Sequence, residues 1–483
     1  MKRKFITNLA LVIFLNLLVK PFWIFGIDRS VQNVVGAESY GLYFSLFSFS
    51  LLLNILLDIG ITSFNNRAIA REPSLLSEYF SNIVVLKLLL AVFYAVICLA
   101  AGLIVGYDTI QFKILILLII NQFLASFLLY LRSNISGLHF FRTDSIISVL
   151  DRTLVIIICS VLLWGGITDQ PFRIEWFVYA QTVAYALTVL VAFLIVLSKS
   201  EYLKPRIDPK YFAGIIRKSY PFALLILLMS FYNRIDSVML ERLLPGGDAS
   251  AGIYAQSFRI LDAAAMFAFL FAGLLLPIFS RMIKQEQPIN EMVRLSFSLI
   301  IIPALTLAAL AFYYSQDIID WMYYERTMES YRIFPLLMFG FVAISTTYIF
   351  GTLLTANGSL FELNLLAGSA VILNVLLNLI LIPRYQAFGA AISSLVTQSY
   401  MALFQVIISV IKFRFRLNIG YLAQLVLFPA GLFTAGYLID KNLESWSRGA
   451  ILLICLAIVF AFSSRLLKLK EIYQIIREER SEE

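Results

Sequence analysis

The chain has 483 residues, of which 60% are apolar and only 14% are charged, and its mean hydropathy is +0.87. Soluble globular domains carry about a quarter charged residues, so this composition excludes an ordinary soluble protein and indicates a polytopic membrane protein. The net charge of +8 does not indicate a nucleic-acid partner, because the lysines and arginines fall in short runs between apolar segments and form no basic stripe.

Apolar runs long enough to cross a ~30 Å hydrocarbon layer recur along the whole chain. They predict an all-α polytopic membrane protein with about fourteen transmembrane helices. The predicted spans lie near residues 5–27, 39–65, 80–106, 112–132, 145–165, 175–198, 221–242, 252–279, 295–314, 333–356, 363–383, 388–411, 421–439 and 448–466.

The first predicted span carries a lysine at depth. Lys20 lies in its outer third and precedes Pro21, which removes one helix hydrogen bond and favours a kink. Lys20 is either a cation that faces a cavity or a side chain that snorkels toward the outer surface. No good small-residue cleavage site closes this apolar run, so we expect an uncleaved helix.

The second predicted span lies within Gly36–Arg71, between an aromatic pair at one end and a polar segment at the other. Asp58 in this span and Lys87 in the next are placed near the inner ends of their helices, where an interfacial role is at least as plausible as transport. We interpret the stretch as scaffold and gate, through Asp58, Arg67 and Arg71.

Most basic residues fall in alternate connections, so both termini are expected on the cytoplasmic side. The longest inner connection, 199–220, divides the chain into halves that look alike, since Gly41-Leu42-Tyr43 and Gly252-Ile253-Tyr254 head corresponding helices. Six helices separate them, so the halves would share one topology. We predict an N-terminal lobe at 1–200, a C-terminal lobe at 201–412, and a last helix pair with a basic tail at 413–483.

Ionisable side chains deep in a membrane normally face a cavity or a partner. Arg234 and Asp236 lie near the middle of the seventh predicted span and point about 200° apart, so each needs a partner elsewhere. For at least one of them we expect a cavity, and the alternative is an ion pair between helices.

Three polar residues share one face of the eighth predicted span. Gln256, Arg259 and Asp262 stand at i, i+3 and i+6, which favours an Arg259–Asp262 pair on a lined cavity. A self-neutralised structural pair is the alternative. Asn374 and Asn378 also share a face; they either line the same cavity or, as is commoner for such amides, form hydrogen bonds between helices.

No motif for metal, nucleotide or covalent chemistry occurs. The chain has one histidine and three cysteines without CxxC spacing, and it lacks HExxH, GxxxxGK[ST] and GxSxG. We therefore expect no enzyme and no cofactor, with a coupling proton or sodium ion left open.

The pattern resembles the lipid-linked oligosaccharide flippases of bacterial polysaccharide synthesis, within the multidrug/oligosaccharidyl-lipid/polysaccharide exporter superfamily. Three stretches carry the resemblance: Gly36–Arg71, the run from Asn233 to Leu240, and Ile382-Pro383 with Gly389-Ala390-Ala391. The family implies two lobes that alternate in access and carry an undecaprenyl-diphosphate-linked glycan across the bacterial cytoplasmic membrane, for surface polysaccharides such as O-antigen.

In that family setting the expected substrate contacts lie in a cationic cavity, lined by Arg234, Arg259, Lys20, Asp236, Asp262 and Gln256. The polyprenyl chain would stay in membrane lipid while the polar head crosses. A polysaccharide polymerase and chain-length machinery are conceivable partners. The alternatives are a multidrug cation antiporter of the same fold, and a membrane polymerase or ligase that uses the outer segment 315–332.

Overall fold

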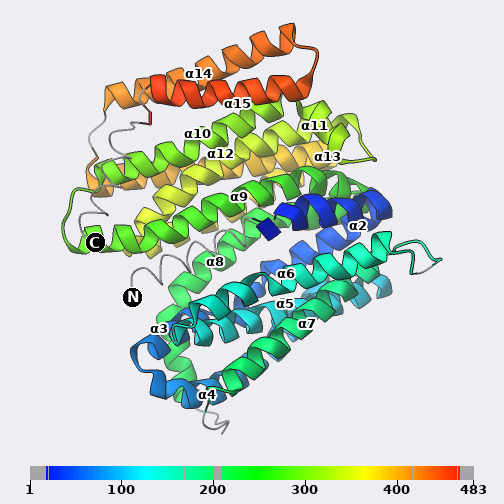
Figure 1. Ribbon diagram of the computed structural model, residues 1–483, viewed down its shortest axis with the longest axis vertical. Helices are drawn as coiled ribbons and strands as arrows, with labels where there is room; N and C mark the ends of the chain where they lie inside the picture. The colour runs from blue at the N-terminus through cyan, green and yellow to red at the C-terminus, as the bar shows by residue number, and fades with distance from the viewer. Residues whose placement is uncertain are drawn as a thin grey trace. The chain divides into compact units, whose positions relative to one another are not determined.

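The computed structural model describes residues 18–19, 21–167, 169–200, 209–415, 418–464 and 466–467, and these are helices and short connections without a strand. Figure 1 shows them coloured in chain order. The elements are η1 Phe22–Asp28, α2 Arg29–Leu52, η2 Asn54–Leu57, α3 Ile61–Arg71, η3 Pro73–Leu75, α4 Leu76–Val105, α5 Thr109–Gly137, α6 Phe141–Trp164, α7 Ile174–Leu197, α8 Pro209–Leu243, α9 Gly247–Lys284, α10 Asn290–Tyr313, α11 Ser315–Met322, α12 Met328–Ala356, α13 Leu360–Phe413, α14 Ile419–Asn442 and α15 Trp446–Ser463.

The polytopic all-α prediction is confirmed. Eleven described helices are long and apolar enough to cross a membrane, and the bent pair Phe22–Leu52 with Asn54–Arg71 makes twelve. Helix α13 adds one more crossing, because Gln386 has non-helical dihedral angles and divides it at the predicted 384–387 turn. Most of the first predicted span lies outside the described residues, although Phe22–Asp28 after Pro21 is π-helical, a local break typical of functional sites.

Local signals in the sequence end and start these helices. Gly106 stops α4 with a left-handed conformation (φ 83°) that costs glycine little. Asp108 then begins α5 with a capping box in which its carboxylate accepts from the Gln111 N–H and the Gln111 side chain accepts from the Asp108 N–H. Helix α12 begins in the same way at Thr327. The three residues between α4 and α5 are thus enough to connect two long helices.

The second predicted span is wrong as a continuous helix over 39–65. Helix α2 ends at Leu52, and the chain passes through the short 3₁₀ segment η2 before α3 begins at Ile61, with a bend of 53°. The cause lies in the dipeptide before α3, since Ile59 and Gly60 both have positive φ, 44° and 82°. A right-handed helix cannot run through two such residues.

The chain divides into two compact units, each described here by itself. The first comprises the described residues up to Ala255 together with Asn378–Gln386. Its core gathers around α3, whose Ile61 and Ile69 are fully buried among side chains of α4, α5, α6 and α7. Figure 1 shows α5, α6 and α7 side by side, in agreement with their packing. The short half-helix α3 is therefore an internal element of this unit.

The second unit comprises Gln256–Leu377 and the described residues from Ala387 onward. One of its cores joins the last two long helices to α10, through Leu432 of α14, Leu453 of α15 and Ala309 of α10, all buried. The predicted lobe boundary near residue 200 adjoins 201–208, which lie outside the described part of the chain. The division into lobes stays a prediction.

Candidate functional site

Two helices of the first unit touch backbone to backbone at a pair of glycines. A Cβ atom on Gly41 of α2 would collide with the Asp248 carbonyl oxygen and lie 2.5 Å from the Gly252 nitrogen. A Cβ atom on Gly252 of α9 would collide with the Ala37 carbonyl oxygen. The Gln32 side chain adds a hydrogen bond of 2.9 Å to the Gly252 carbonyl oxygen. Only small residues permit this approach of two membrane helices.

The contact is reciprocal. Gly41 meets Asp248 and Gly252 meets Ala37, and the difference between 252 and 41 equals that between 248 and 37, which is 211 residues. Two equivalent helices related by a two-fold axis make such a contact, in which i meets j and j meets i. The offset is that of the sequence repeat headed by Gly41 and Gly252. The duplication itself stays a prediction.

Tyr43 and Tyr254, the tyrosines of the two repeated Gly-x-Tyr sequences, each form a hydrogen bond to a side chain on another helix of the first unit. The Tyr43 hydroxyl accepts a hydrogen bond of 3.0 Å from the Gln181 side chain. The Tyr254 hydroxyl donates to one oxygen of Asp236 at 3.1 Å, and the Asn378 side chain donates to the other at 2.7 Å. Asp236 is only 1% exposed. Tyr254 and Asn378 are thus two of the groups that bind this predicted site residue, and the sequence did not assign Asn378 to it.

The predicted arginine of α8 lies two residues before Asp236. Arg234 is half-buried, and its role as a substrate contact stays a prediction. Lys20 lies outside the described residues.

The predicted polar face of α9 is present in the second unit. An Nη atom of Arg259 lies 3.7 Å from a carboxylate oxygen of Asp262, so the predicted pair is confirmed. The Gln256 amide donates to the Glu325 carbonyl oxygen at 2.6 Å and accepts from the Ser330 hydroxyl at 3.0 Å. Both ends of this amide are thus engaged within the unit. The contacts of all three residues with a substrate stay predictions.

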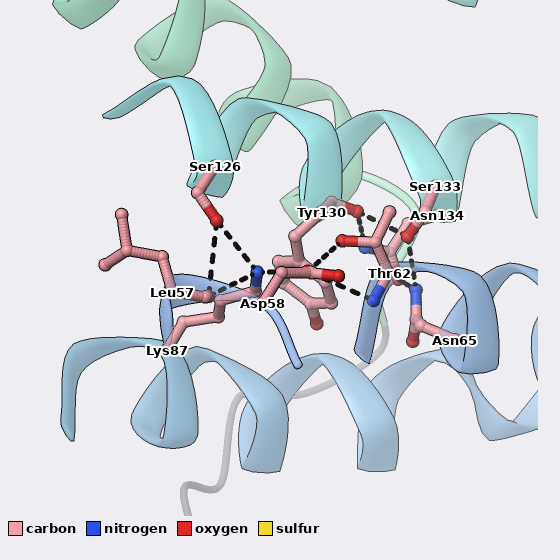
Figure 2. Close-up of polar contacts among 9 residues, drawn as sticks. All are labelled: Leu57, Asp58, Thr62, Asn65, Lys87, Ser126, Tyr130, Ser133 and Asn134. Carbon is pink, nitrogen blue, oxygen red and sulfur yellow. Dashed lines mark hydrogen bonds and ion pairs between the residues drawn. The ribbon is translucent and has the colours of Figure 1, made fainter. Parts of the chain in front are cut away.

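A charged cluster fills the break between α2 and α3 (Figure 2). The Lys87 ammonium of α4 lies 2.5 Å from an oxygen of Asp58, and it donates to the Leu57 carbonyl oxygen at 2.9 Å and to the Ser126 hydroxyl of α5 at 3.1 Å. The same Asp58 oxygen accepts from the Thr62 N–H at 3.2 Å and from the Thr62 hydroxyl. Asp58 therefore caps the first turn of α3 while it binds Lys87.

The interfacial role weighed for Asp58 and Lys87 stays a prediction. The Lys87 side chain is 1% exposed, while that of Asp58 is 28% exposed. The two residues are 29 positions apart on different helices, and no short spacing in the sequence connects them. The structure brings them together because the break leaves Leu57 and Asp58 facing α4.

On the C-terminal side of the break, polar side chains bind α3 to α5 (Figure 2). The buried Asn65 side chain donates to the Ser133 hydroxyl at 2.8 Å and to the Asn134 side-chain oxygen at 3.1 Å. The two other predicted gate residues, Arg67 and Arg71, lie exposed on the same helix. The buried side of α3 is thus fixed to α5, and its arginines lie on the opposite, exposed side.

Gly60 tests how much the break depends on its left-handed turn. Gly60→Ala is expected to lower the free energy of unfolding by about 1–2 kcal/mol, because a Cβ atom is unfavourable at positive φ. Gly340→Ala is the matched control: it lies inside α12 with no atom within 4 Å of an added Cβ, so alanine should be neutral or stabilising there. Thermal unfolding of both variants measures the contrast, and equal midpoints would contradict it.

The model of one protein family, described as polysaccharide biosynthesis protein, matches residues 25–283. The chain belongs to this family. The match includes the glycine crossing, the helix break and the charged residues of α8 and α9. No curated protein sequence matches the chain.

Solved structures similar to the family member described here are transporters. The lipid II flippase MurJ in an inward closed conformation is 14% identical, covers 94% of this chain and 99% of its own, and gives a TM-score of 0.70. An inward-facing multidrug resistance MATE family transporter is 14% identical over 83% and 98%, with a TM-score of 0.59. A MOP superfamily transporter from Pyrococcus furiosus is 15% identical over 85% and 95%, with 0.57. The chain has the fold of this superfamily.

Proposed function

We propose that the protein is a flippase that translocates polyprenyl-diphosphate-linked oligosaccharide units across the cytoplasmic membrane of a bacterium for polysaccharide synthesis. The observation that carries this proposal is the family match to polysaccharide biosynthesis proteins over residues 25–283. The likeness in fold to a lipid II flippase over 94% of the chain supports it. Both termini are proposed to be cytoplasmic, as the distribution of lysine and arginine predicts.

The chemistry of the cargo agrees with the charges of the helices. A diphosphate is an anion that arginine binds through paired N–H donors, which suits Arg234 and Arg259 along the path of the polar head. Lys20 would add a third cation. Each buried CH₂ of a polyprenyl chain gains about 0.8 kcal/mol in an apolar medium, so the tail stays in lipid. Asp262 pairs with Arg259, and the three cations outnumber the carboxylates Asp236 and Asp262, so the net charge of these residues is positive.

The glycine crossing of α2 and α9 supports transport by alternating access. If the lobes are the predicted duplicates, Gly41 and Gly252 are equivalent residues, and their helix backbones touch within the first unit. Alternating access would require these two backbones to separate during transport. The proposal therefore assigns to Gly41 and Gly252 the closing contact, and to Asp58, Arg67 and Arg71 a supporting role in the half-helix α3.

A multidrug cation antiporter is the second candidate, because the fold is also that of MATE transporters. A cationic cargo would favour carboxylates along its path, whereas this chain offers Arg234, Arg259 and Lys20. A polymerase or ligase in segment 315–332 is less favoured, since Asp320 there is engaged by Arg326 at 3.4 Å and by the Tyr331 hydroxyl at 2.6 Å. Binding to a polymerase or to chain-length machinery would follow from the transport role.

Loss of either arginine tests the flippase proposal. Arg234→Ala or Arg259→Ala is expected to reduce glycan export at least tenfold at unchanged membrane abundance, because a charge-assisted bond to a phosphate group contributes about 1.5–3 kcal/mol. Lysine at either position should retain part of the activity. Arg281→Ala, at an exposed position of α9, is the control and should export normally. Normal export by both alanine variants would remove the proposal of a cationic path.

Transport in proteoliposomes tests the driving force. Purified protein with a fluorescent polyprenyl-diphosphate glycan would be assayed under an imposed proton gradient, an imposed sodium gradient, or neither. An equal rate in all three would identify substrate-driven exchange, whereas acceleration by one gradient would identify the coupling ion.

A further inference from the structure

The break between α2 and α3 leaves three oxygen atoms that converge on one point. The Leu57 carbonyl lies where helical pairing stops, and the bonds it accepts come from the side chains of Lys87 and Ser126, at 2.9 and 3.2 Å. One Asp58 oxygen and the Ser126 hydroxyl complete the set at 2.5 and 3.1 Å from the same Lys87 nitrogen. Figure 2 shows Lys87 and Ser126 directed from α4 and α5 toward the broken segment. A helix break that faces two neighbouring helices produces this geometry.

The oxygen set is of the type that binds a small hard cation. It combines one carboxylate, one main-chain carbonyl and one hydroxyl, and carboxylate and carbonyl oxygens are the ligands that such ions prefer. Carbonyl groups freed by interrupted membrane helices coordinate monovalent ions in other transporter folds. The formal charge of the set is −1, which one monovalent cation neutralises. The Lys87 ammonium has three N–H donors for these three acceptors, and its side chain is 1% exposed.

We propose that Leu57, Asp58 and Ser126 form a monovalent-cation site whose resident cation is the Lys87 ammonium. The protein thereby carries its own ion at the helix break, and the break keeps its shape without a dissolved cation. Removal of the lysine side chain would leave room and a negative charge for sodium.

A simple structural ion pair makes a different prediction. In that case the loss of Lys87 would destabilise the protein to the same extent in any salt of equal ionic strength, because no site would select the cation. In the proposed site the Thr62 N–H and hydroxyl hold the Asp58 oxygen in place whether or not Lys87 is present, so the remaining oxygens stay arranged for an ion. The identity of the cation therefore separates the two cases.

The experiment compares thermal unfolding of the purified full chain in sodium, potassium and choline chloride at equal ionic strength. Lys87→Ala is expected to unfold several degrees higher in sodium than in choline, with a shift that saturates as sodium is raised. The wild-type protein should show equal midpoints in sodium and choline. Adding Asp58→Asn to Lys87→Ala should abolish the sodium shift, and adding Ser126→Ala should raise the sodium concentration needed for half of it.

Two outcomes would overturn the proposal. One is an equal midpoint of Lys87→Ala in sodium and choline. The other is a failure of Lys87→Ala to be purified even in sodium while Lys87→Ala with Asp58→Asn can be purified, because sodium would then not replace the ammonium. Glycan export is not measured here, so a negative result leaves the transport proposal standing, and the loss of that proposal leaves this one standing.

Discussion

Gly252→Leu is expected to abolish glycan export. The Gly252 Cα approaches the Ala37 carbonyl so closely that even a single methyl group collides with it, and a leucine side chain would force α9 away from α2. Under the proposed function, the two helices could then no longer come together, and a transporter that alternates between states would be held in one of them. Surface polysaccharide measured in cells that depend on this protein, with membrane abundance measured in parallel, gives the result.

Gly273→Leu provides the matched control for this substitution. It lies on the same helix, is exposed, and has no atom within 4 Å of an added Cβ, so export should stay normal. Gly41→Leu should reproduce the defect from the other helix. If Gly252→Ala is as abundant as the wild type and exports normally, the crossing is not required to close during transport.

Asp58→Ala is expected to cost about 3–5 kcal/mol of unfolding free energy, because it leaves the ammonium of Lys87 buried without its counter-charge. The partial exposure of Asp58 places the value toward the lower end of this range. Exchange of both residues, Asp58→Ala with Lys87→Met, removes the uncompensated charge and should recover most of the loss. Chemical unfolding of the two single variants and the double variant in one detergent measures the coupling, and simple additivity of the two losses would contradict it.

The sequence predicted most of the helices, because each membrane crossing needs a long apolar run and its ends carry local signals such as Gly106 followed by Asp108. It failed at residues 53–60, where Asn54 and Asp58 interrupt an otherwise apolar run and were included in the predicted span. The signal that could have found the break is Asp58 two residues before Gly60. A carboxylate that accepts a hydrogen bond from a first-turn N–H, as Asp58 does from Thr62, is typical of a helix start.

In the candidate site, too, contacts within one helix could be predicted from the sequence, whereas contacts between helices could not. The pair of Arg259 and Asp262 was predictable, since three residues along a helix bring side chains onto one face. The partners of Asp236 were not, because Asn378 lies 142 positions later in the chain. A single sequence carries helical periodicity but no record of which helices become neighbours. It therefore shows that a buried polar residue requires a partner on another helix, but not which residue that partner is.

The crossing at Gly41 and Gly252 also affects the rate at which α2 and α9 can separate. Two helices that interlock through large side chains must change rotamers before they part, and each such change adds to the activation barrier. At Gly41 and Gly252 the nearest atoms across the crossing are main-chain atoms, and the Gln32 hydrogen bond is the one side-chain bond described to Gly252. The two helices can therefore separate by a rigid displacement once the hydrogen bond from Gln32 to the Gly252 carbonyl oxygen breaks. Gln32→Leu should shift the resting population toward the open state, and faster labelling of a cysteine placed nearby would show this shift.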